Sequence, residues 1–376
     1  MDTMQPQGMV AQAKDIPNVI RSQMSLYESN VRAALSADEM KRMRRLWLVG
    51  SGDSYHASRA VELFFEKVAG IQVEPFNSQL FLDYGADYIP RPSERNIVVA
   101  ISASGRSVRV VSCIEKARAA GNMTIALSGA TDQPVPLAAE RVIHAPLPPF
   151  TASPGVRNYI ATLLSLYLLG IAMGEARGKI KAAEAASLRE ELLKTADVIE
   201  ATLKAVEGKA GAVVNAIKDA QIMLFLGSGP SFATAMFSAA KLVENAAVFS
   251  ASQDLEEWAH VEGVAYPNDI PTFIIAPPGL SYWRAAEVAR AAAKRQRRVI
   301  AVVQDGDTEV AGAAQFVLPV MGAVREEFSP LVYETFSYFI AMHLAEELGR
   351  KPFQRDNTEM WKNPDASGGI RPAAAG

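Results

Sequence analysis

One strand–turn–helix pattern occurs twice in this chain of 376 residues, and the repeat limits the folds that the chain can adopt. The apolar run LWLVG at 46–50 leads into the turn SGDS, and the run IMLFLG at 222–227 leads into SGPS. Gly52 and Gly229 are 177 residues apart (229 − 52), and Leu127 and Val303, which end later apolar runs, are 176 apart (303 − 127). Two nearly equal offsets favour a duplicated domain over chance.

Each half contains three short apolar runs separated by stretches of helical composition. The runs lie at 46–50, 96–101 and 123–127 in the first half and at 222–227, 272–276 and 299–303 in the second. Helices are predicted near 55–69 and 107–120. Strands that alternate with helices at this spacing form right-handed βαβ units and a parallel sheet covered on both faces. The predicted fold class is therefore α/β, with two tandem doubly wound parallel-sheet domains and bridging helices.

The composition around these runs divides the chain into five predicted parts. An apolar helix is expected over 160–174, and the stretch 175–219, rich in Ala, Lys and Glu, is expected to form one or two helices. The periodicity is lost after residue 350. The predicted parts are an N-terminal helical segment (1–30), a first α/β domain (31–174), a helical linker (175–219), a second α/β domain (220–349) and a tail (350–376).

Charge and cysteine content exclude several classes of protein. The 38 Lys and Arg residues are balanced by 41 Asp and Glu residues, so there is no basic stripe typical of a nucleic-acid surface. The single cysteine, Cys113, excludes a disulfide framework or a cysteine-based zinc site, and no other cluster suggests a metal or a cofactor. The stretch 159–174 is expected to be a buried helix, too short to span a bilayer, and no signal peptide is expected. We therefore expect a soluble, cytoplasmic protein that binds neither nucleic acid nor a membrane.

The run at 96–101 ends in a serine-rich loop that directly precedes a predicted helix. Its sequence, SASGRS, places the hydroxyls of Ser102, Ser104 and Ser107 around Gly105. Ligands of open parallel sheets bind beyond the carboxyl ends of the strands, and hydroxyls with free N–H groups at a helix N-terminus suit a phosphomonoester. A serine helix cap would explain only Ser104 or Ser107. The loop is neither a Walker loop nor a dinucleotide fingerprint, so the phosphate of a small metabolite is the expected ligand.

The second half has a different loop at the corresponding place. The sequence APPGLS at 276–281 contains two prolines, which remove backbone donors, so one phosphate site per chain is expected. The second half then serves another purpose, for which Glu244 and His260 are candidates. Moving a proton between adjacent carbons of a sugar needs a carboxylate or an imidazole. On spacing alone, a solvated glutamate and a structural histidine are the simpler interpretation.

The motifs LVGSGDS (48–54) and ISASG (101–105), together with the repeat, resemble the sugar isomerase (SIS) domains, which have a flavodoxin-like fold. From about residue 9 to 349 the layout is similar to the isomerase half of glucosamine-fructose-6-phosphate aminotransferase and to the fructosamine-6-phosphate (fructoselysine-type) deglycases. This resemblance implies a set of phosphate- and sugar-binding residues drawn from both loops. The set is Gly52, Asp53, Ser54, Ser102, the backbone of Ala103, Ser104 and Ser107.

The segments KLVE (241–244) and EWAH (257–260) are similar to a second motif of that family. The resemblance implies that Glu244 is the general base of a C1–C2 proton shift. It implies that His260, contributed by a neighbouring subunit, assists ring opening or acts as an acid, with Glu257 able to orient it. Ser153 is implied as a sugar contact. Lys362 lies within two residues of the place of a Schiff-base lysine, with an exposed tail lysine as the alternative, and Glu256 is expected to be solvated.

The resemblance implies a phosphosugar-processing enzyme of aminosugar metabolism. The first hypothesis is a deglycase that cleaves a fructosamine (Amadori) 6-phosphate to an aldose 6-phosphate and an amine. The alternatives are an aminosugar-phosphate isomerase or deaminase with the same base, and a non-catalytic sugar-phosphate sensor. Because the chain starts with MDT, without the cysteine of a glutaminase domain, glutamine-driven synthesis is not expected. No cofactor is expected, and the chain is expected to form a homodimer with a shared active site.

Overall fold

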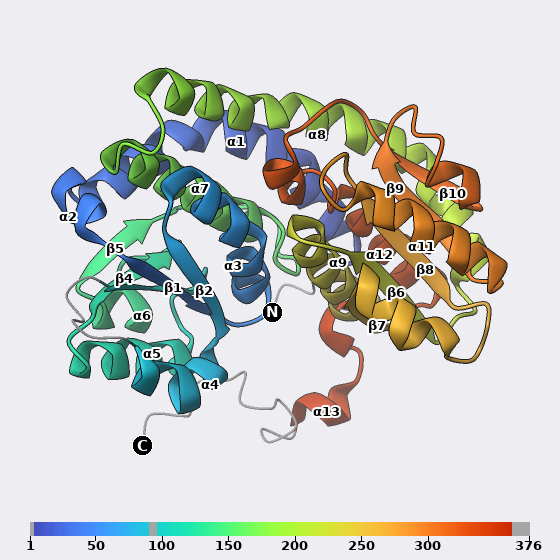
Figure 1. Ribbon diagram of the computed structural model, residues 1–376. Coiled ribbons are helices and arrows are strands. Elements are labelled where there is room, and N and C mark those ends of the chain that lie inside the picture. Colours follow the sequence, from blue (N-terminus) through green and yellow to red (C-terminus); the bar gives the residue numbers. More distant parts are fainter. Residues whose placement is uncertain (1–3, 90–95, 363–376) are drawn as a thin grey trace. The chain divides into compact units, whose positions relative to one another are not determined.

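A computed structural model describes residues 4–89 and 96–362 of the chain. It divides into two compact units, each with one five-stranded parallel sheet (Figure 1). Of the described residues, the first-sheet unit contains 19–89, 96–149, 157–193 and 357–362, and the second-sheet unit contains 4–18, 150–156 and 194–356. Helices α1 (Gln7–Ala34) and α8 (Ala182–Ile217) each contribute residues to both units.

The first sheet has the strand order β2-β1-β3-β4-β5, and its paired strands are all parallel. Its strands are β1 (Arg45–Gly50), β2 (Gln72–Asn77), β3 (Asn96–Ile101), β4 (Met123–Ser128) and β5 (Arg141–His144). The helical segments of this unit, besides its parts of α1 and α8, are α2 (Ala37–Arg42), α3 (Asp53–Phe64), η1 (Phe65–Ala69), α4 (Ser78–Leu80), η2 (Phe81–Gly85), η3 (Ala86–Tyr88), α5 (Val108–Ala119), α6 (Pro134–Ala138), α7 (Arg157–Ala176) and α13 (Thr358–Lys362). Helices α3 and α7 lie on one face of the sheet, and α5 and α6 on the other (Figure 1).

Both faces of the first sheet are buried, as expected for a doubly wound sheet. Trp47 and Val49 of β1 pack with Cys113 and Ala117 of α5 in one apolar cluster. Residues of opposite orientation in β1, such as Leu48, are also fully buried. Because successive side chains of a strand point to opposite faces, burial of both requires the continuous apolar runs seen in the sequence.

Helix α7 is the apolar helix expected over 160–174, and it is longer than expected. It has 20 residues, and by length and composition it is apolar enough to cross a membrane. However, 89% of its apolar window is buried inside the protein, as in the core helix of a globular domain. The expectation that the helix is too short was therefore wrong, and the expectation that it is buried is confirmed.

The second sheet repeats this plan with the order β10-β9-β8-β6-β7. Its strands are β6 (Ile222–Gly227), β7 (Phe249–Asp254), β8 (Pro271–Ala276), β9 (Arg298–Gln304) and β10 (Phe316–Val320). The helical segments are α9 (Pro230–Ala246), α10 (Leu255–His260), η5 (Glu262–Val264), α11 (Tyr282–Lys294), η6 (Ala311–Ala313), η7 (Glu326–Leu331), α12 (Thr335–Glu347) and η8 (Pro352–Gln354). On one face, Phe225 stacks on Phe273 with ring centroids 4.5 Å apart, and Phe336 of α12 stacks on Phe273. Helices α10 and α11 pack on the other face.

The predicted α/β fold with two doubly wound parallel sheets is confirmed, and all six predicted strands are present. The sequence did not reveal four strands, β2, β5, β7 and β10, which are the two edge strands of each sheet. The stretch 175–219 contains one long helix, α8. Part of the expected tail, 363–376, lies outside the described residues.

Arg177, which directly follows α7, joins several segments of the first-sheet unit. Its Nε donates to the Ala69 carbonyl at 2.8 Å and its Nη2 to the Gly70 carbonyl at 3.1 Å. Its Nη1 donates to the Met43 carbonyl, at the end of α2. Burial lowers the pKa of this guanidinium. One side chain thus fastens the loops before β1 and before β2 to the end of α7.

Candidate functional site

The two loops predicted to bind phosphate lie together at the carboxyl ends of the strands of the first sheet. Strand β1 pairs with β2 on one side and with β3 on the other, so the strand order reverses between β1 and β3. The turn after β1 and the loop after β3 therefore lie at the switch point, where ligands of open parallel sheets bind. A Cβ added to Gly50 would lie 3.3 Å from the Ile101 carbonyl oxygen, which shows how closely the two segments approach.

The turn after β1 depends on two glycines. Gly52 has φ 55° and ψ −129°, a conformation that residues with a Cβ rarely adopt. A Cβ on Gly50 would lie 2.6 Å from the Cβ of Ser54, so this position has no room for a side chain. The Gly52 carbonyl accepts N–H groups from Tyr55 and His56 at 2.9 and 3.0 Å, which starts α3. Asp53 and Ser54 therefore lie in the first turn of a twelve-residue helix, where the Ser54 N–H donates to the Ser51 carbonyl at 3.3 Å.

The serine loop after β3 is fixed to the neighbouring strand by its backbone. Ser102 N–H donates to the Leu127 carbonyl, and the Ala103 carbonyl accepts from Gly129 N–H, both at 3.0 Å. Gly105 has φ 71°, and its N–H donates to the Ser102 carbonyl at 3.0 Å. The loop thus has a defined shape before any ligand binds.

The hydroxyls of this loop are not used to cap α5. Ser107 occupies the N-cap position, but its side chain makes no capping hydrogen bond. Ser104 Oγ accepts only a long hydrogen bond from the Arg106 N–H, at 3.4 Å. Ser102 is buried, with 6% of its surface exposed. Within 4–89 and 96–362, no hydrogen bond involves the hydroxyl of Ser102 or Ser107. The capping alternative therefore does not account for Ser107.

The second-sheet unit contains the same turn but a different loop. Gly229 has φ 58° and ψ −130°, nearly the conformation of Gly52, which supports the duplication. In the loop after β8, the N–H of Leu280 donates to both carboxylate oxygens of Glu326, each at 3.1 Å. A Cβ on Gly279 would lie 2.1 Å from the carboxylate carbon, so a side chain at this position would displace the Glu326 carboxylate. An acidic side chain of the protein itself thus occupies this second loop.

Glu244 belongs to a buried ion pair on α9. Its Oε2 accepts a hydrogen bond of 2.6 Å from the Nζ of Lys241, whose side chain is completely buried. The Lys241 ammonium also donates to the Gly155 carbonyl at 3.0 Å and lies 4.7 Å from the centre of the Phe237 ring. The Glu244 side chain is 26% exposed, so its carboxylate is fixed by a buried cation and still accessible to a ligand.

Ser153 belongs to the same unit as Glu244, in the segment that Lys241 contacts through Gly155. Its hydroxyl is buried and has no hydrogen-bond partner among the described residues. A Cβ on Gly8 would lie 2.7 Å from the Ala152 carbonyl oxygen, so this segment packs closely against the start of α1. The structure thus links the segment of Ser153 to Glu244 through Lys241.

His260 is the last residue of α10, and its side chain is 70% exposed. Its Nε2 lies 3.0 Å from Oε1 of Glu256, and Oε2 of Glu256 lies 2.6 Å from Nη2 of Arg284. Glu257 makes no side-chain hydrogen bond among the described residues. The residue that contacts His260 is therefore Glu256, which the sequence suggested to be merely solvated.

The predicted site residues divide between the two units. Gly52, Asp53, Ser54, Ser102, Ala103, Ser104, Ser107 and Lys362 belong to the first-sheet unit, whereas Ser153, Glu244, Glu257 and His260 belong to the second-sheet unit. Lys362 is the last residue of α13. Sequence analysis assigned no role to Lys241 or Glu256. The i,i+3 spacing of Lys241 and Glu244 and the i,i+4 spacing of Glu256 and His260 were the available signals.

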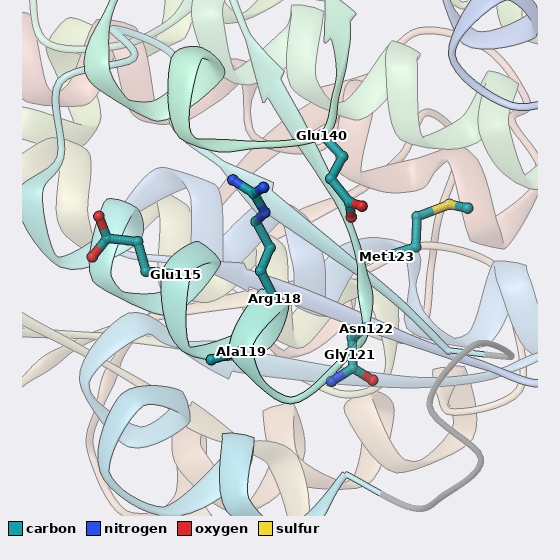
Figure 2. Close-up of a pocket in the computed structure, with 7 residues that line it drawn as sticks. All are labelled: Glu115, Arg118, Ala119, Gly121, Asn122, Met123 and Glu140. Carbon is teal, nitrogen blue, oxygen red and sulfur yellow. The ribbon is translucent and has the colours of Figure 1, made fainter.

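A pocket of about 630 Å³ lies at the amino ends of the strands of the first sheet, opposite to the two loops (Figure 2). It is lined by Met123, which begins β4, and by three charged side chains, of which Arg118 and Glu140 form hydrogen bonds within the protein. Glu140 accepts from the Thr124 N–H at 2.8 Å, and Arg118 donates to the Ala138 carbonyl at 2.9 Å. Because it lies at the amino end of β4, this pocket is separate from the switch point.

The described part of the chain supports neither a metal site nor a cysteine nucleophile. In 4–89 and 96–362 there is no group of three or more His, Cys, Asp or Glu side chains that could hold a metal ion. Burial raises the pKa of Cys113 to about 12, and its thiol donates to the Ser78 carbonyl. Cys113 therefore remains a protonated core residue rather than a nucleophile.

Comparison with known proteins gives consistent results. The model of the SIS domain matches residues 39–172. The glutamine–fructose-6-phosphate aminotransferase (isomerizing) of Brucella abortus is 23% identical over 341 residues, which are 91% of this chain and 55% of that protein. The chain thus spans about half the length of the curated relatives that it matches.

Solved structures show where the fold recurs. The C-terminal domain of glucosamine-fructose-6-phosphate aminotransferase from Francisella tularensis superposes with a TM-score of 0.79 at 15% identity, covering 91% of this chain and 96% of that one. Tagatose-6-phosphate ketose/aldose isomerase from Escherichia coli superposes with a TM-score of 0.71 at 15% identity, covering 92% and 94%. The chain therefore carries a SIS domain and is homologous to the isomerase domain of the glutamine–fructose-6-phosphate aminotransferases.

Proposed function

We propose that this protein is a phosphosugar-processing enzyme of the deglycase type, which cleaves a fructosamine 6-phosphate to an aldose 6-phosphate and a free amine. In this proposal the first SIS domain (31–174) holds the phosphate with Ser102, Ser104 and Ser107 and with the helix N-termini after Gly52 and Gly105. The second domain (220–349) supplies Glu244 as the base.

The proposed reaction moves a proton from C1 to C2 and then hydrolyses the C–N bond. Glu244 removes a proton from C1, which lies next to the C2 carbonyl, the carbonyl oxygen takes up a proton from solvent, and an enaminol forms. Return of the first proton to C2, with release of the N–H proton to solvent, leaves an imine at C1 and a hydroxyl at C2. Water then adds to this imine, the C–N bond breaks, and the amine leaves from an aldose 6-phosphate. Binding of the phosphate fixes the positions of C1 and C2, so it contributes to the rate through orientation.

The observation that carries the proposal is the serine loop after β3. Its backbone is fixed by hydrogen bonds to β4, while Ser107 sits at the N-cap of α5 without capping it. The arrangement offers hydroxyl groups and N–H groups with no fixed negative charge, which suits a dianionic phosphate. The names of the similar proteins, an isomerizing fructose-6-phosphate aminotransferase and a ketose/aldose phosphate isomerase, support a phosphosugar substrate.

The catalytic proposal rests on Glu244 and its contact with Lys241. A carboxylate with one buried cation beside it and a quarter of its surface exposed can take and return a proton without leaving its place. An aldose–ketose isomerase or an aminosugar-phosphate deaminase would use the same base on the same carbons. Assays with different substrates, rather than the geometry of the site, therefore distinguish the deglycase from the isomerase and the deaminase.

The test is a panel of fructosyl-amino acid 6-phosphates, assayed for release of glucose 6-phosphate. Release supports the deglycase, whereas turnover of a hexosamine 6-phosphate alone favours the isomerase or deaminase. Binding of sugar phosphates without turnover of any compound favours the sensor. Glu244→Gln should bind sugar phosphate nearly as tightly as the wild type and lose turnover, while Glu287→Gln, an exposed change on α11, should keep both. Full activity of Glu244→Gln would refute the assignment of the base.

We further propose that the protein is a homodimer with a shared active site. The exposed His260 is compatible with a histidine that acts in a neighbouring subunit. Light scattering coupled to size exclusion should give twice the chain mass of 40.5 kDa, about 81 kDa. Full specific activity in a sample that is monomeric at nanomolar concentration would contradict the shared site.

A further inference from the structure

His260, Glu256 and Arg284 form a chain of polar contacts on the surface of the second-sheet unit. The His260 Nε2 is 3.0 Å from one carboxylate oxygen of Glu256, and the Arg284 Nη2 is 2.6 Å from the other. Both carboxylate oxygens are therefore used, one by each neighbour. An isolated i,i+4 pair on a helix surface contributes little, but a carboxylate held between a guanidinium and an imidazole has its position fixed from two sides.

The backbone beneath these side chains is firmly anchored. Leu255 and Trp258 of α10 are buried, with exposed fractions of 1% and 0%, so the opposite side of this short helix faces outward. Asp254 caps α10 and accepts the Glu256 N–H at 2.8 Å, and it also accepts the Ser228 hydroxyl. The positions of Glu256 and His260 thus follow from a core contact and a cap rather than from chance contacts of a mobile segment.

We infer that Glu256, held by Arg284, is the positioning residue of His260, and that it fixes the ring so that Nδ1 is the nitrogen offered to substrate. This inference rests on the proposed function, because it assigns a partner to the histidine of that reaction. An ionised carboxylate can only accept hydrogen bonds, so the ring nitrogen that faces Glu256 must carry a proton. The neutral ring then has its lone pair on Nδ1.

The arrangement suits the opening of a cyclic sugar. Nδ1 accepts the proton of the anomeric hydroxyl, and the ring becomes an imidazolium with the Glu256 carboxylate beside its other nitrogen. The C–O bond to the ring oxygen breaks, and Nδ1 returns the proton to that oxygen. The proton count is unchanged, and the open-chain carbonyl needed for the Glu244 step results.

Glu256 rather than Glu257 makes this contact, although the two are adjacent in sequence. Residues three and four positions apart are both neighbours on a helix surface, and in this structure the i,i+4 residue, Glu256, makes the contact. Arg284 has a second partner, Glu287, at 2.9 Å. Glu287→Gln is therefore a matched control, because it makes the same chemical change at a partner of the same arginine and does not touch His260.

The first measurement is the kinetics of Glu256→Gln. A glutamine can accept from the ring through its oxygen or donate to it through its nitrogen, so the preference for one ring form is lost. We expect kcat to fall roughly tenfold to a hundredfold with KM changed less than about twofold, as when an orienting partner of a histidine is removed. Arg284→Gln should give a smaller loss of kcat, and Glu287→Gln should match the wild type. Wild-type kcat in Glu256→Gln would overturn the inference.

The second measurement does not depend on turnover. The chain has four histidines, so selective ¹⁵N-histidine labelling gives few ring signals, and comparison with His260→Gln assigns that of His260. Above the titration range of imidazole, at a pH of about 8.5, the wild-type ring of His260 should carry its proton on Nε2. Glu256→Gln should show a mixture of both ring forms, and Glu287→Gln should show the wild-type form.

The outcomes separate this inference from the proposed function. An Nδ1–H ring in the wild type, or the same mixture in wild type and Glu256→Gln, would overturn the role of Glu256 whatever the substrate is. Failure of the wild type to turn over any phosphosugar would remove the proposed function, and the ring form measured by NMR would still decide the positioning.

Discussion

The ion pair between Lys241 and Glu244 allows a quantitative test of the site by a double-mutant cycle. The Lys241 side chain is fully buried, and its ammonium has a Glu244 oxygen at 2.6 Å and the Gly155 carbonyl at 3.0 Å. Removing one partner of a buried pair costs roughly 3–5 kcal/mol, because the other charge stays buried and loses its counter-charge. Since Glu244 is 26% exposed, solvent screens part of the attraction, and we expect Glu244→Gln to lower the free energy of unfolding by about 3 kcal/mol.

Lys241→Met should be less harmful. Methionine is long, unbranched and apolar, so it fills the buried position without a charge, while the exposed part of Glu244 is solvated by water. We expect a loss of about 1–2 kcal/mol, mostly from the Gly155 carbonyl that loses its donor. In the double variant no buried charge remains, so its stability should be close to that of Lys241→Met. The coupling energy of the cycle should therefore be about 3 kcal/mol.

Urea unfolding followed by circular dichroism measures these values, and Glu287→Gln controls for the loss of an exposed carboxylate. For a chain of 376 residues that unfolds as one unit, the loss of about 3 kcal/mol in Glu244→Gln corresponds to a decrease in Tm of roughly 4 °C, so kinetic assays of this variant belong well below its transition. Additive effects of the two substitutions, within about 0.5 kcal/mol, would refute the view that a buried ammonium depends on this carboxylate.

Three further predictions concern the stability of the chain. Hydrogen bonds from Arg141 lower the pKa of Glu39 to about 2, so the ion pair stabilises the fold fully above a pH of about 4.5, and this stabilisation is lost as the pH falls to about 2. Above a pH of about 4.5, Glu39→Gln should lower the unfolding free energy by about 1 kcal/mol, because the site is partly exposed. The difference from the wild type should vanish as the pH falls from about 4.5 to about 2. Burial raises the pKa of Glu334 well above its ordinary value, so Glu334→Gln should stabilise the protein increasingly as the pH rises above about 4.5, by at most about 1.4 kcal/mol per pH unit, and a pH-independent difference would contradict this. The buried Arg297 donates to five carbonyls of residues 262–268, so Arg297→Lys should lower the unfolding free energy by about 3 kcal/mol and speed hydrogen exchange in that loop; unchanged exchange would show that the loop is held otherwise.

The central strands could be predicted from the sequence, and the edge strands could not. Strands β1, β3 and β4 are buried on both faces, and this burial requires the continuous apolar runs that identified them. The edge strands contact a neighbour on one side only, so their sequences are mixed. Strand β7, for example, has the sequence FSASQD, and β2 and β10 contain the prolines Pro75 and Pro319, which edge strands tolerate.

The loops of the candidate site were predictable because they follow the central strands. The strand order that brings the turn at Gly52 and the loop at Ser102 to one edge is a property of the whole sheet, and only the structure supplies it. Contacts between side chains were harder to predict from the sequence. Nothing in the local sequence distinguishes Glu256 from Glu257 as the partner of His260, because both are acidic and exposed, and the direction of α10 on its core decides between them.

The alternation of the chain between its two compact units affects any attempt to dissect it. A fragment ending at residue 174, where the repeat would suggest a cut, loses Arg177 and with it the carbonyl contacts to Met43, Ala69 and Gly70. A fragment beginning at 220 lacks the piece of α8 that belongs to its unit. Each unit therefore needs segments that lie outside its own half of the repeat, and expression of half genes cut at residues 174 and 220 should yield insoluble or proteolysed products rather than functional halves.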